Sequence, residues 1–166
     1  CLEKRLYLPA VIVMHNWLKK KFLYGPYSSP PLAPARVNGL LLIPKGESNV
    51  RIVTDFSRPV GQSFNDHVDP SFKQKCFLQM STFDDVKKAV RIAGSGCFFL
   101  KQDFCDAYKM LKIKDSQIHA QQFYFGGSFW VDTSLVFGDL TAVHQFSYIH
   151  YTLSDALSLP FASIPP

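Results

Sequence analysis

Two aspartates follow a short apolar run near the middle of the chain. Asp103 comes after Cys97–Leu100, which predicts a buried strand, and Asp106 lies three residues further on. Carboxylates at a strand end suit Mg²⁺, which prefers oxygen ligands and usually shares them with substrate phosphates. Two interpretations stand at this point. One is a metal-dependent site for phosphoryl chemistry, and the other is a pair of solvated turn or helix-capping residues.

Three charged residues lie on a second candidate element. Val50–Phe56 is a β-branched run, so Arg51 and Asp55, four residues apart, are expected on one face of a strand, and Lys45 lies at the tip of the same hairpin. Arginine binds phosphate through two parallel hydrogen bonds and lysine adds a mobile positive charge, so this hairpin could hold a triphosphate. The alternative is a surface ion pair between Arg51 and Asp55 beside a solvated lysine.

Helical and extended segments must position these residues. Apolar spacing predicts a helix over Ala10–Phe22 with a basic end at Lys19, Lys20 and Lys21, and the proline-rich Gly25–Pro34 predicts an extended connector. Leu40–Pro44 pairs with Val50–Phe56 as a hairpin.

Two further elements follow along the chain. Thr82–Ala93 predicts a helix, with acidic residues in its first turn and Gly94 just past its end. Gln121–Phe125 and Ser128–Val131 predict a hairpin around Gly126-Gly127. This irregular alternation of helices and antiparallel strands predicts an α+β fold.

The composition is that of a folded, basic protein. The 166 residues are 47% hydrophobic and 19% charged, which excludes a disordered chain and favours one domain. The net charge of +5 favours a polyanionic partner, and the alternative is a basic but otherwise ordinary domain. No apolar run approaches the ~20 residues that a membrane-spanning helix needs. The four cysteines show no disulfide or zinc-ligand spacing and no signal peptide is recognised, so we expect an intracellular protein, cytoplasmic or nuclear, that is not secreted.

The charged groups occur in one order with characteristic neighbours. The order is Pro44-Lys45, then Arg51–Phe56, then Asp103-Phe104-Cys105-Asp106-Ala107-Tyr108, then Leu135-Val136-Phe137-Gly138. This combination resembles the fingers and partial palm of a reverse transcriptase. Three further segments resemble the retrotransposons that use a tyrosine recombinase, the DIRS-like group: Gly25–Pro31, Arg36–Asn38 and Ser63–Val68.

The resemblance implies roles in metal and triphosphate binding. Asp103 matches the first catalytic aspartate, which holds two Mg²⁺ ions, and Phe104 matches the neighbour whose carbonyl completes one metal shell. Asp106 and Ala107 match the turn whose backbone N–H groups meet the triphosphate. Tyr108 matches the aromatic gate under the sugar, which excludes a ribose 2′-OH.

The resemblance also implies roles for the hairpin and a later loop. Arg51 matches the finger arginine over the base and the α-phosphate, and Asp55 matches its strand partner. Lys45 matches the triphosphate lysine. Phe137 and Gly138 match the loop that contacts the new base pair and the template.

The chain also departs from the family. The usual Leu-Pro-x-Gly is Leu135–Gly138 here, and the second metal motif, an aromatic-x-Asp-Asp hairpin, is missing. The only acids after Gly138 are Asp139, where an aliphatic residue is usual, and Asp155, which we expect at a helix N-terminus. The two-metal site is therefore expected to be incomplete.

We expect three segments: an N-terminal helical segment over 1–23, fingers and partial palm over 24–146, and a divergent, truncated or frameshifted tail over 147–166. The resemblance implies template-directed nucleotidyl transfer from a dNTP to a primer 3′-OH in the complete enzyme, with template–primer and dNTP as partners and downstream palm, thumb and RNase H-like regions. The alternatives are an inactive nucleic-acid-binding remnant and a non-folding product of a decayed element.

Overall fold

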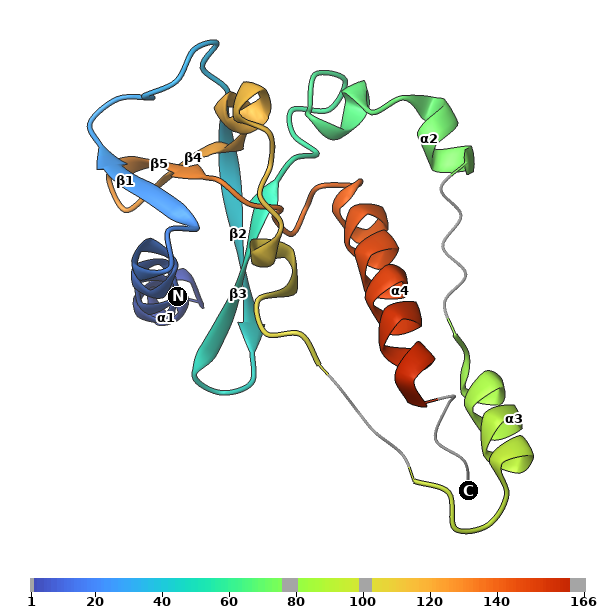
Figure 1. The fold of residues 1–166 in the computed structure, drawn as a ribbon. Coiled ribbons are helices and arrows are strands. Elements are labelled where there is room, and N and C mark those ends of the chain that lie inside the picture. The colour runs from blue at the N-terminus through green and yellow to red at the C-terminus, as the bar shows by residue number, and fades with distance from the viewer. Residues whose placement is uncertain (1, 76–80, 99–102, 162–166) are drawn as a thin grey trace.

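The computed structural model describes residues 2–75, 81–98 and 103–161. Its centre is a five-stranded sheet with strand order β1-β5-β4-β2-β3 (Figure 1). The strands are β1 Leu23–Tyr27, β2 Val37–Lys45, β3 Asn49–Asp55, β4 Gln122–Phe125 and β5 Ser128–Asp132. The helices are α1 Leu2–Lys19, α2 Pro70–Lys75, α3 Phe83–Ala93 and α4 Ala142–Phe161, with 3-10 helices η1 Asn65–His67, η2 Ala107–Met110 and η3 Asp115–Gln121. The predicted α+β class is confirmed.

The long β2–β3 hairpin is built as the sequence predicts. Its strands pair from Gly39 with Asp55 to Lys45 with Asn49, which leaves a three-residue turn. Side chains alternate along β3, so that Val50, Ile52 and Thr54 are buried while Arg51 lies exposed on the other face. Because Asp55 is four residues from Arg51, it shares that face, as predicted.

One parallel pair joins this hairpin to the rest of the sheet, whereas the other neighbouring strands are antiparallel. Only Val37 and Asn38 of β2 pair with β4. The buried Asn38 side chain donates to the carbonyl oxygens of Ala120 at 2.8 Å and Gln122 at 2.9 Å. A short ladder is therefore reinforced by a side-chain amide that satisfies two buried carbonyls.

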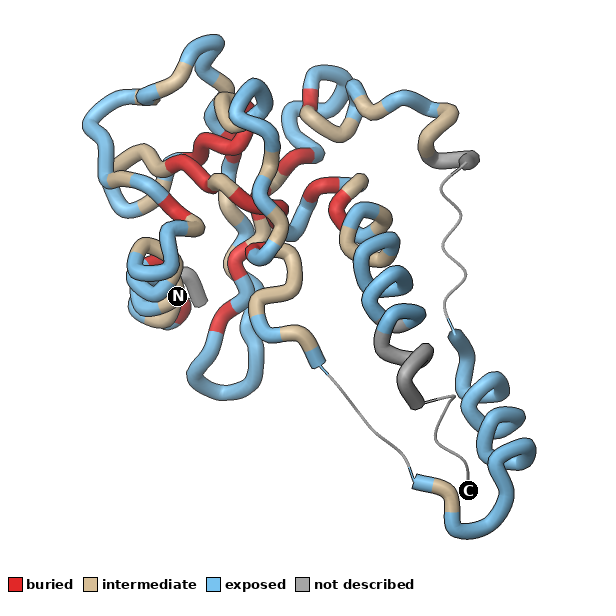
Figure 2. The backbone as a smooth tube through the Cα atoms, viewed as in Figure 1, coloured by how far each residue is buried: buried red, intermediate tan, exposed pale blue. Residues whose placement is uncertain are grey.

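The main core lies between α1 and one face of the sheet. Leu6, Ala10 and Met14 recur every four residues along α1, as one face of a helix requires. They pack against buried strand residues, namely Leu23, Val50, Ile52 and Phe123 (Figure 2). The predicted bounds of this helix, Ala10–Phe22, are wrong. The helix begins at Leu2 and ends at Lys19, because the chain turns away at Lys20 and Lys21 to enter β1.

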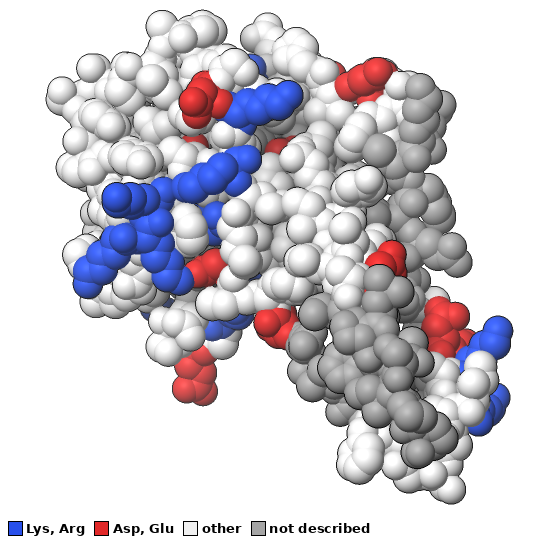
Figure 3. Space-filling view, viewed as in Figure 1, with Lys and Arg blue, Asp and Glu red and all other residues white. Residues whose placement is uncertain are grey.

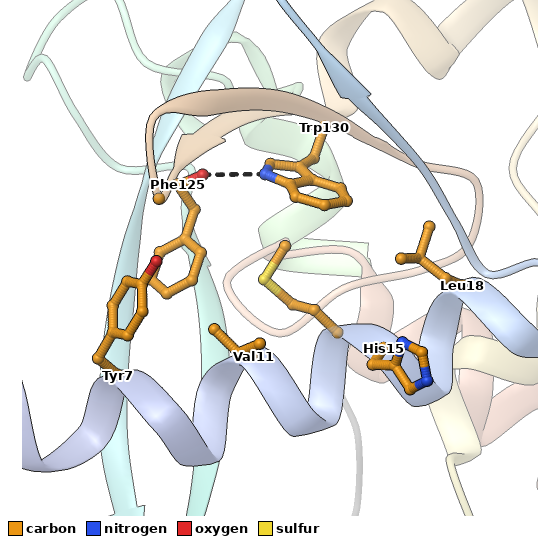
Figure 4. Close-up of a pocket in the computed structure, with 8 residues that line it drawn as sticks. Tyr7, Val11, His15, Leu18, Phe125 and Trp130 are labelled. Carbon is orange, nitrogen blue, oxygen red and sulfur yellow. Dashed lines mark hydrogen bonds between the residues drawn. The ribbon is translucent and has the colours of Figure 1, made fainter.

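The β4–β5 hairpin turns at Gly126-Gly127, as predicted. Both glycines have positive φ, +62° and +84°, which a two-residue turn of type I′ demands. Beside the hairpin, α1 leaves a pocket of about 260 Å³. At one end of this pocket the rings of Tyr7 and Phe125 stack with centroids 5.2 Å apart, and Trp130 Nε1 donates to the Phe125 carbonyl at 3.0 Å (Figure 4).

The proline-rich segment begins with a strand, so the prediction of a connector throughout Gly25–Pro34 is wrong. Gly25, Pro26 and Tyr27 belong to β1, which pairs with β5 across an irregularity between Tyr24 and Tyr27. Proline is tolerated there because β1 is an edge strand and needs ladder hydrogen bonds on one side only.

The helix predicted over Thr82–Ala93 is confirmed as α3, with a capping box between Thr82 and Asp85 and with Gly94 at its end. Its residues are exposed, and it lies away from the sheet (Figures 1 and 2). The strand predicted over Cys97–Leu100 falls partly outside the described residues. Cys97 and Phe98, which are described, lie in no strand, and Phe98 is exposed.

The placement of Asp155 at a helix N-terminus is wrong. Asp155 lies inside α4, which already begins at Ala142. Asp139 lies three residues before the start of α4, where its Oδ1 accepts hydrogen bonds from the Thr141 N–H at 2.7 Å and the Thr141 hydroxyl at 2.8 Å. No described helix is long and apolar enough to cross a membrane.

Candidate functional site

A row of ring contacts runs from the β2–β3 hairpin to α4. The Arg51 guanidinium lies over the Phe137 ring, with Cζ 5.1 Å from its centroid. Phe137 contacts Tyr108 of η2, with ring centroids 4.8 Å apart. Tyr108 meets Phe146 of α4 edge-on at 5.7 Å, and Phe146 meets Phe104 at 5.5 Å. The row therefore brings together four residues predicted from distant parts of the sequence.

The loop that carries Phe137 is held against β3 and η1. The Thr54 N–H donates to the Phe137 carbonyl at 2.9 Å. Asn65 donates from Nδ2 to the Gly138 carbonyl at 2.9 Å and accepts from the Leu140 N–H at 3.1 Å. Gly138 has φ +106°, and a Cβ there would overlap the Thr54 carbonyl oxygen. Glycine is therefore required by the close approach of the loop to β3.

Tyr108 is partly buried at its position in this row. Burial raises the pKa of its phenol, and the nearby Asp139 carboxylate raises that pKa further. Both effects disfavour the phenolate, because neither an apolar environment nor a neighbouring carboxylate stabilises a second negative charge. Tyr108 therefore acts here as a neutral aromatic surface with a polar hydroxyl.

The turn before Tyr108 is bound to the end of α1. Asp106 has φ +53°, a left-handed conformation that is uncommon outside glycine, and it directly precedes η2, as predicted for the turn. Its carboxylate forms an ion pair with Lys20, and this hydrogen bond raises the pKa of Lys20. Ala107 begins η2, so its N–H has no intrahelical acceptor. That the N–H groups of this turn bind a triphosphate remains a prediction.

A buried ion pair holds η2, the 3-10 helix that carries Tyr108, against the end of β5. Lys109 directly follows Tyr108, and its ammonium bonds to the Asp132 carboxylate at the end of β5. The two side chains are 7% and 2% exposed, and Lys109 Nζ lies 4.0 Å from the centroid of the Trp17 ring. Asp132 also accepts from the Ser134 N–H at 3.0 Å. This pair links η2, β5 and α1.

The structure does not contain the surface ion pair between Arg51 and Asp55 that was the alternative interpretation of the hairpin. Asp55 pairs with Arg58 at 3.6 Å, and not with Arg51, because Arg51 turns to Phe137. Lys45 is exposed at the end of β2. The hairpin tip is attached to α1 by Arg5, whose Nη2 donates to the Glu47 carbonyl at 3.3 Å. That both cations face Asp103 across an open cleft remains a prediction.

Asp103 begins the described segment that leads into this row. It is exposed, and the ring of the adjacent Phe104 packs against both Phe146 and His150. Its predicted place at the end of a central strand lies outside the described residues. In the described part of the chain no three histidine, cysteine or acidic residues gather into a metal site. Asp103 is the carboxylate that the resemblance assigns to Mg²⁺, and an incomplete two-metal site remains a prediction.

Several supporting residues escaped sequence reasoning. The sequence places Lys20 only at a basic helix end, and it indicates no role for Lys109, Asp132 or Phe146. Asn65 lies in Ser63–Val68, where no pattern indicates its contact with the 135–140 loop. A weak signal existed for Lys109, which follows Tyr108 directly. Its partner lies 23 residues away, and no local pattern identifies it.

A scan against protein-family models finds no match, and a search of curated proteins finds none. Among solved structures, the chain is similar to a foamy viral protease-reverse transcriptase in complex with double-stranded DNA, with a TM-score of 0.60 and 15% identity over 90% of this chain and 23% of that chain. It is also similar to the Prototype Foamy Virus protease-reverse transcriptase, as a CSH mutant (TM-score 0.60, 16% identity, 90% and 18% coverage) and as the native protein (0.54, 18%, 96% and 18%).

These matches show the fold, which is that of reverse-transcriptase fingers and a partial palm, as the sequence predicts. The chain spans between 18% and 23% of the length of these solved chains.

Proposed function

We propose that this chain is the fingers and partial palm of a retroelement reverse transcriptase of the DIRS-like, tyrosine-recombinase group. In the complete enzyme the reaction is transfer of a nucleotide from a dNTP to a primer 3′-OH on a template. The observation that carries the proposal is the row of contacts from Arg51 through Phe137 to Tyr108, which joins three separately predicted nucleotide-binding residues. The fold and the order of the motifs support it.

Each residue of this row has a distinct task in the proposal. Stacking of Arg51 on Phe137 orients the planar guanidinium, so that its N–H groups can bind a phosphate with two parallel hydrogen bonds. Phe137 and Gly138 contact the new base pair, and Tyr108 lies under the sugar. Lys45 at the hairpin tip and the N–H groups of Asp106 and Ala107 hold the triphosphate. Asp55 pairs with Arg58, three residues beyond the end of β3.

The partners are template–primer and dNTP. A related fold has been solved with double-stranded DNA, which supports a duplex as the larger partner. In the complete enzyme Asp103 and the Phe104 carbonyl would hold Mg²⁺, which would activate the attacking oxygen and stabilise the leaving pyrophosphate. The described cysteines, Cys97 and Cys105, are free thiols.

We expect no primer extension by the purified chain in either Mg²⁺ or Mn²⁺. The reason is that no Asp-Asp pair follows Phe104, so half of the carboxylates of a two-metal site are missing. A gel assay with labelled primer, template and dNTPs measures this, with Asp103→Asn as the control. Template-dependent incorporation that disappears in Asp103→Asn would show that the chain completes its metal site in another way.

Binding is the sharper test of the proposed function. We expect the chain to bind a recessed template–primer, in the presence of the next dNTP, about fivefold or more tightly than a blunt duplex, since stacking on one base is worth about 1–3 kcal/mol. Phe137→Ala should abolish this preference, because it removes the ring between Arg51 and Tyr108. Fluorescence anisotropy measures both affinities.

The matched control is Phe83→Ala, which removes an exposed phenylalanine on α3 and should keep the preference. An intact preference in Phe137→Ala would contradict the assignment of this loop. A second candidate function, an inactive nucleic-acid-binding remnant, is favoured by the missing Asp-Asp. It predicts equal affinity for recessed and blunt duplexes in the unmodified chain.

A further inference from the structure

Lysines from two distant segments gather around Phe22. Lys20 Nζ lies 5.8 Å and Lys112 Nζ 5.3 Å from the centroid of this ring. Lys112 also donates to the Lys21 carbonyl at 2.7 Å, so the turn after α1 and the segment after η2 are joined here. Figure 3 shows a concentration of lysine and arginine side chains on one face of the molecule, apart from a smaller group at α3. We call Lys20, Lys21 and Lys112 the Phe22 lysine cluster.

The positive charge of this cluster is only partly neutralised. Lys20 pairs with Asp106, but Lys112 donates to two neutral oxygens, the Lys21 carbonyl and Thr133 Oγ1, each at 2.7 Å. An ammonium has three donors, so one donor of Lys112 remains for a further acceptor. Burial lowers the pKa of Lys112, and Asp132 raises it. Lys112 is exposed, so its remaining donor is accessible to an anion.

Lys21 lies in a backbone conformation that favours glycine. Its φ is +57°, and α1 ends there through hydrogen bonds from the Lys21 N–H to the Leu18 carbonyl at 3.0 Å and from the Phe22 N–H to the Trp17 carbonyl at 2.9 Å. Glycine is the usual residue at this position of a helix end, because a Cβ is strained there. Lys21 is exposed, and its side chain makes no hydrogen bond or ion pair to the described residues. A lysine at position 21 therefore places a positive charge on the surface but strains the backbone, which lowers the stability of the fold.

We propose that the Phe22 lysine cluster binds the phosphate backbone of a nucleic acid strand. The choice of nucleic acid as the polyanion rests on the proposed function. Ammonium groups act as point charges without the planar fork that recognises base edges, so such a surface binds backbone of any sequence. Through the Lys20–Asp106 pair the cluster adjoins the turn that leads to Tyr108, so a strand held here would lie next to the candidate site.

The test is the salt dependence of binding to a labelled blunt duplex. Each phosphate contact contributes about 0.9 to the slope of log affinity against log salt. We therefore expect Lys21→Gln/Lys112→Gln to lower the slope by about 2 and the affinity at 0.1 M NaCl by about tenfold or more. The control, Lys88→Gln/Arg91→Gln, removes the same charge from exposed residues of α3 and should change the slope by much less.

One further variant distinguishes a loss of duplex affinity from a loss of stability. Lys21→Gly removes the charge but relieves the backbone strain, so its melting temperature should rise while its duplex affinity falls. Equal slopes in the cluster and α3 double variants would overturn the proposal, because net charge alone would then explain binding. A loss confined to free dNTP, with duplex binding unchanged, would also overturn it.

Failure of the proposed function gives a different result. If the unmodified chain shows no preference for a recessed template–primer while the cluster variants still lose duplex affinity, the phosphate-binding surface stands and the polymerase assignment fails. If the preference is present and the cluster variants bind the duplex like the unmodified chain, the polymerase assignment stands and this proposal fails.

Discussion

Replacing Gly138 with alanine should destabilise the fold by about 3–5 kcal/mol, and the melting temperature should fall by about 10 °C. A Cβ at this position would overlap the Thr54 carbonyl oxygen and lie 3.1 Å from the Thr54 carbonyl carbon, and φ is +106°. These atoms belong to the backbone of β3, so they cannot move aside as a flexible side chain would. The loop must instead leave β3, which breaks the hydrogen bond from the Thr54 N–H to the Phe137 carbonyl.

Gly46→Ala is the matched control. Gly46 also has a positive φ, +70°, but no atom of the described residues beyond its chain neighbours lies within 4 Å of an added Cβ, so only the backbone strain of about 1 kcal/mol is expected. Urea unfolding of the two variants measures the difference. A loss in Gly138→Ala no larger than in Gly46→Ala would contradict the close approach of this loop to β3. Because the loop carries Phe137, Gly138→Ala should also remove the preference for a recessed template–primer.

The second large effect is expected from the buried ion pair. Lys109→Met should cost about 3–5 kcal/mol, because it leaves the Asp132 carboxylate, 2% exposed, without its cation. The double variant Lys109→Met/Asp132→Asn should recover at least half of this loss, since no buried charge remains. Lys87→Met, which breaks an exposed ion pair with Asp84, should cost at most about 1 kcal/mol. Denaturant unfolding measures all three.

The pH dependence of Lys109→Met gives an independent check. Burial raises the pKa of Asp132, and Lys109 lowers it. Removing Lys109 should therefore raise this pKa further, so that the folded state binds a proton more tightly than the unfolded state does. Stability of the variant should then increase as the pH falls from 7 towards the unfolded pKa of the carboxyl group. A variant whose stability falls over this range would contradict a buried, unpaired carboxyl at position 132.

The sequence alone was sufficient for the elements whose signals are local. The spacing in α3, its capping residues and Gly94 lie within about a dozen residues of one another. The β4–β5 turn depends only on two consecutive glycines and the strands that flank them. Alternation along β3 was enough to place Arg51 and Asp55 on one face. In each case neighbours in sequence determine the backbone conformation, so the prediction needs no tertiary contact.

Local sequence patterns gave the wrong prediction where contacts with residues far along the chain determine the structure. Pro26 discouraged a strand, but β1 forms because β5 supplies an edge to pair with. Spacing suggested an ion pair between Arg51 and Asp55, but Arg51 turns to Phe137 once the 135–140 loop docks on β3. The end of α1 depends likewise on the chain entering β1, and not on the lysines themselves.

The order and type of the chemical residues are therefore determined by the sequence, whereas their assembly is decided by the tertiary structure. The roles of Asp103, Tyr108, Arg51 and Phe137 are assigned from their neighbours in sequence, and these roles remain predictions. The ion pair of Lys20 with Asp106 joins residues 86 positions apart, and that of Lys109 with Asp132 crosses from η2 to β5. Such pairs depend on the packing of the sheet and α1, because the strength of a charge pair is set by the distance between the two charges and by how far they are removed from water.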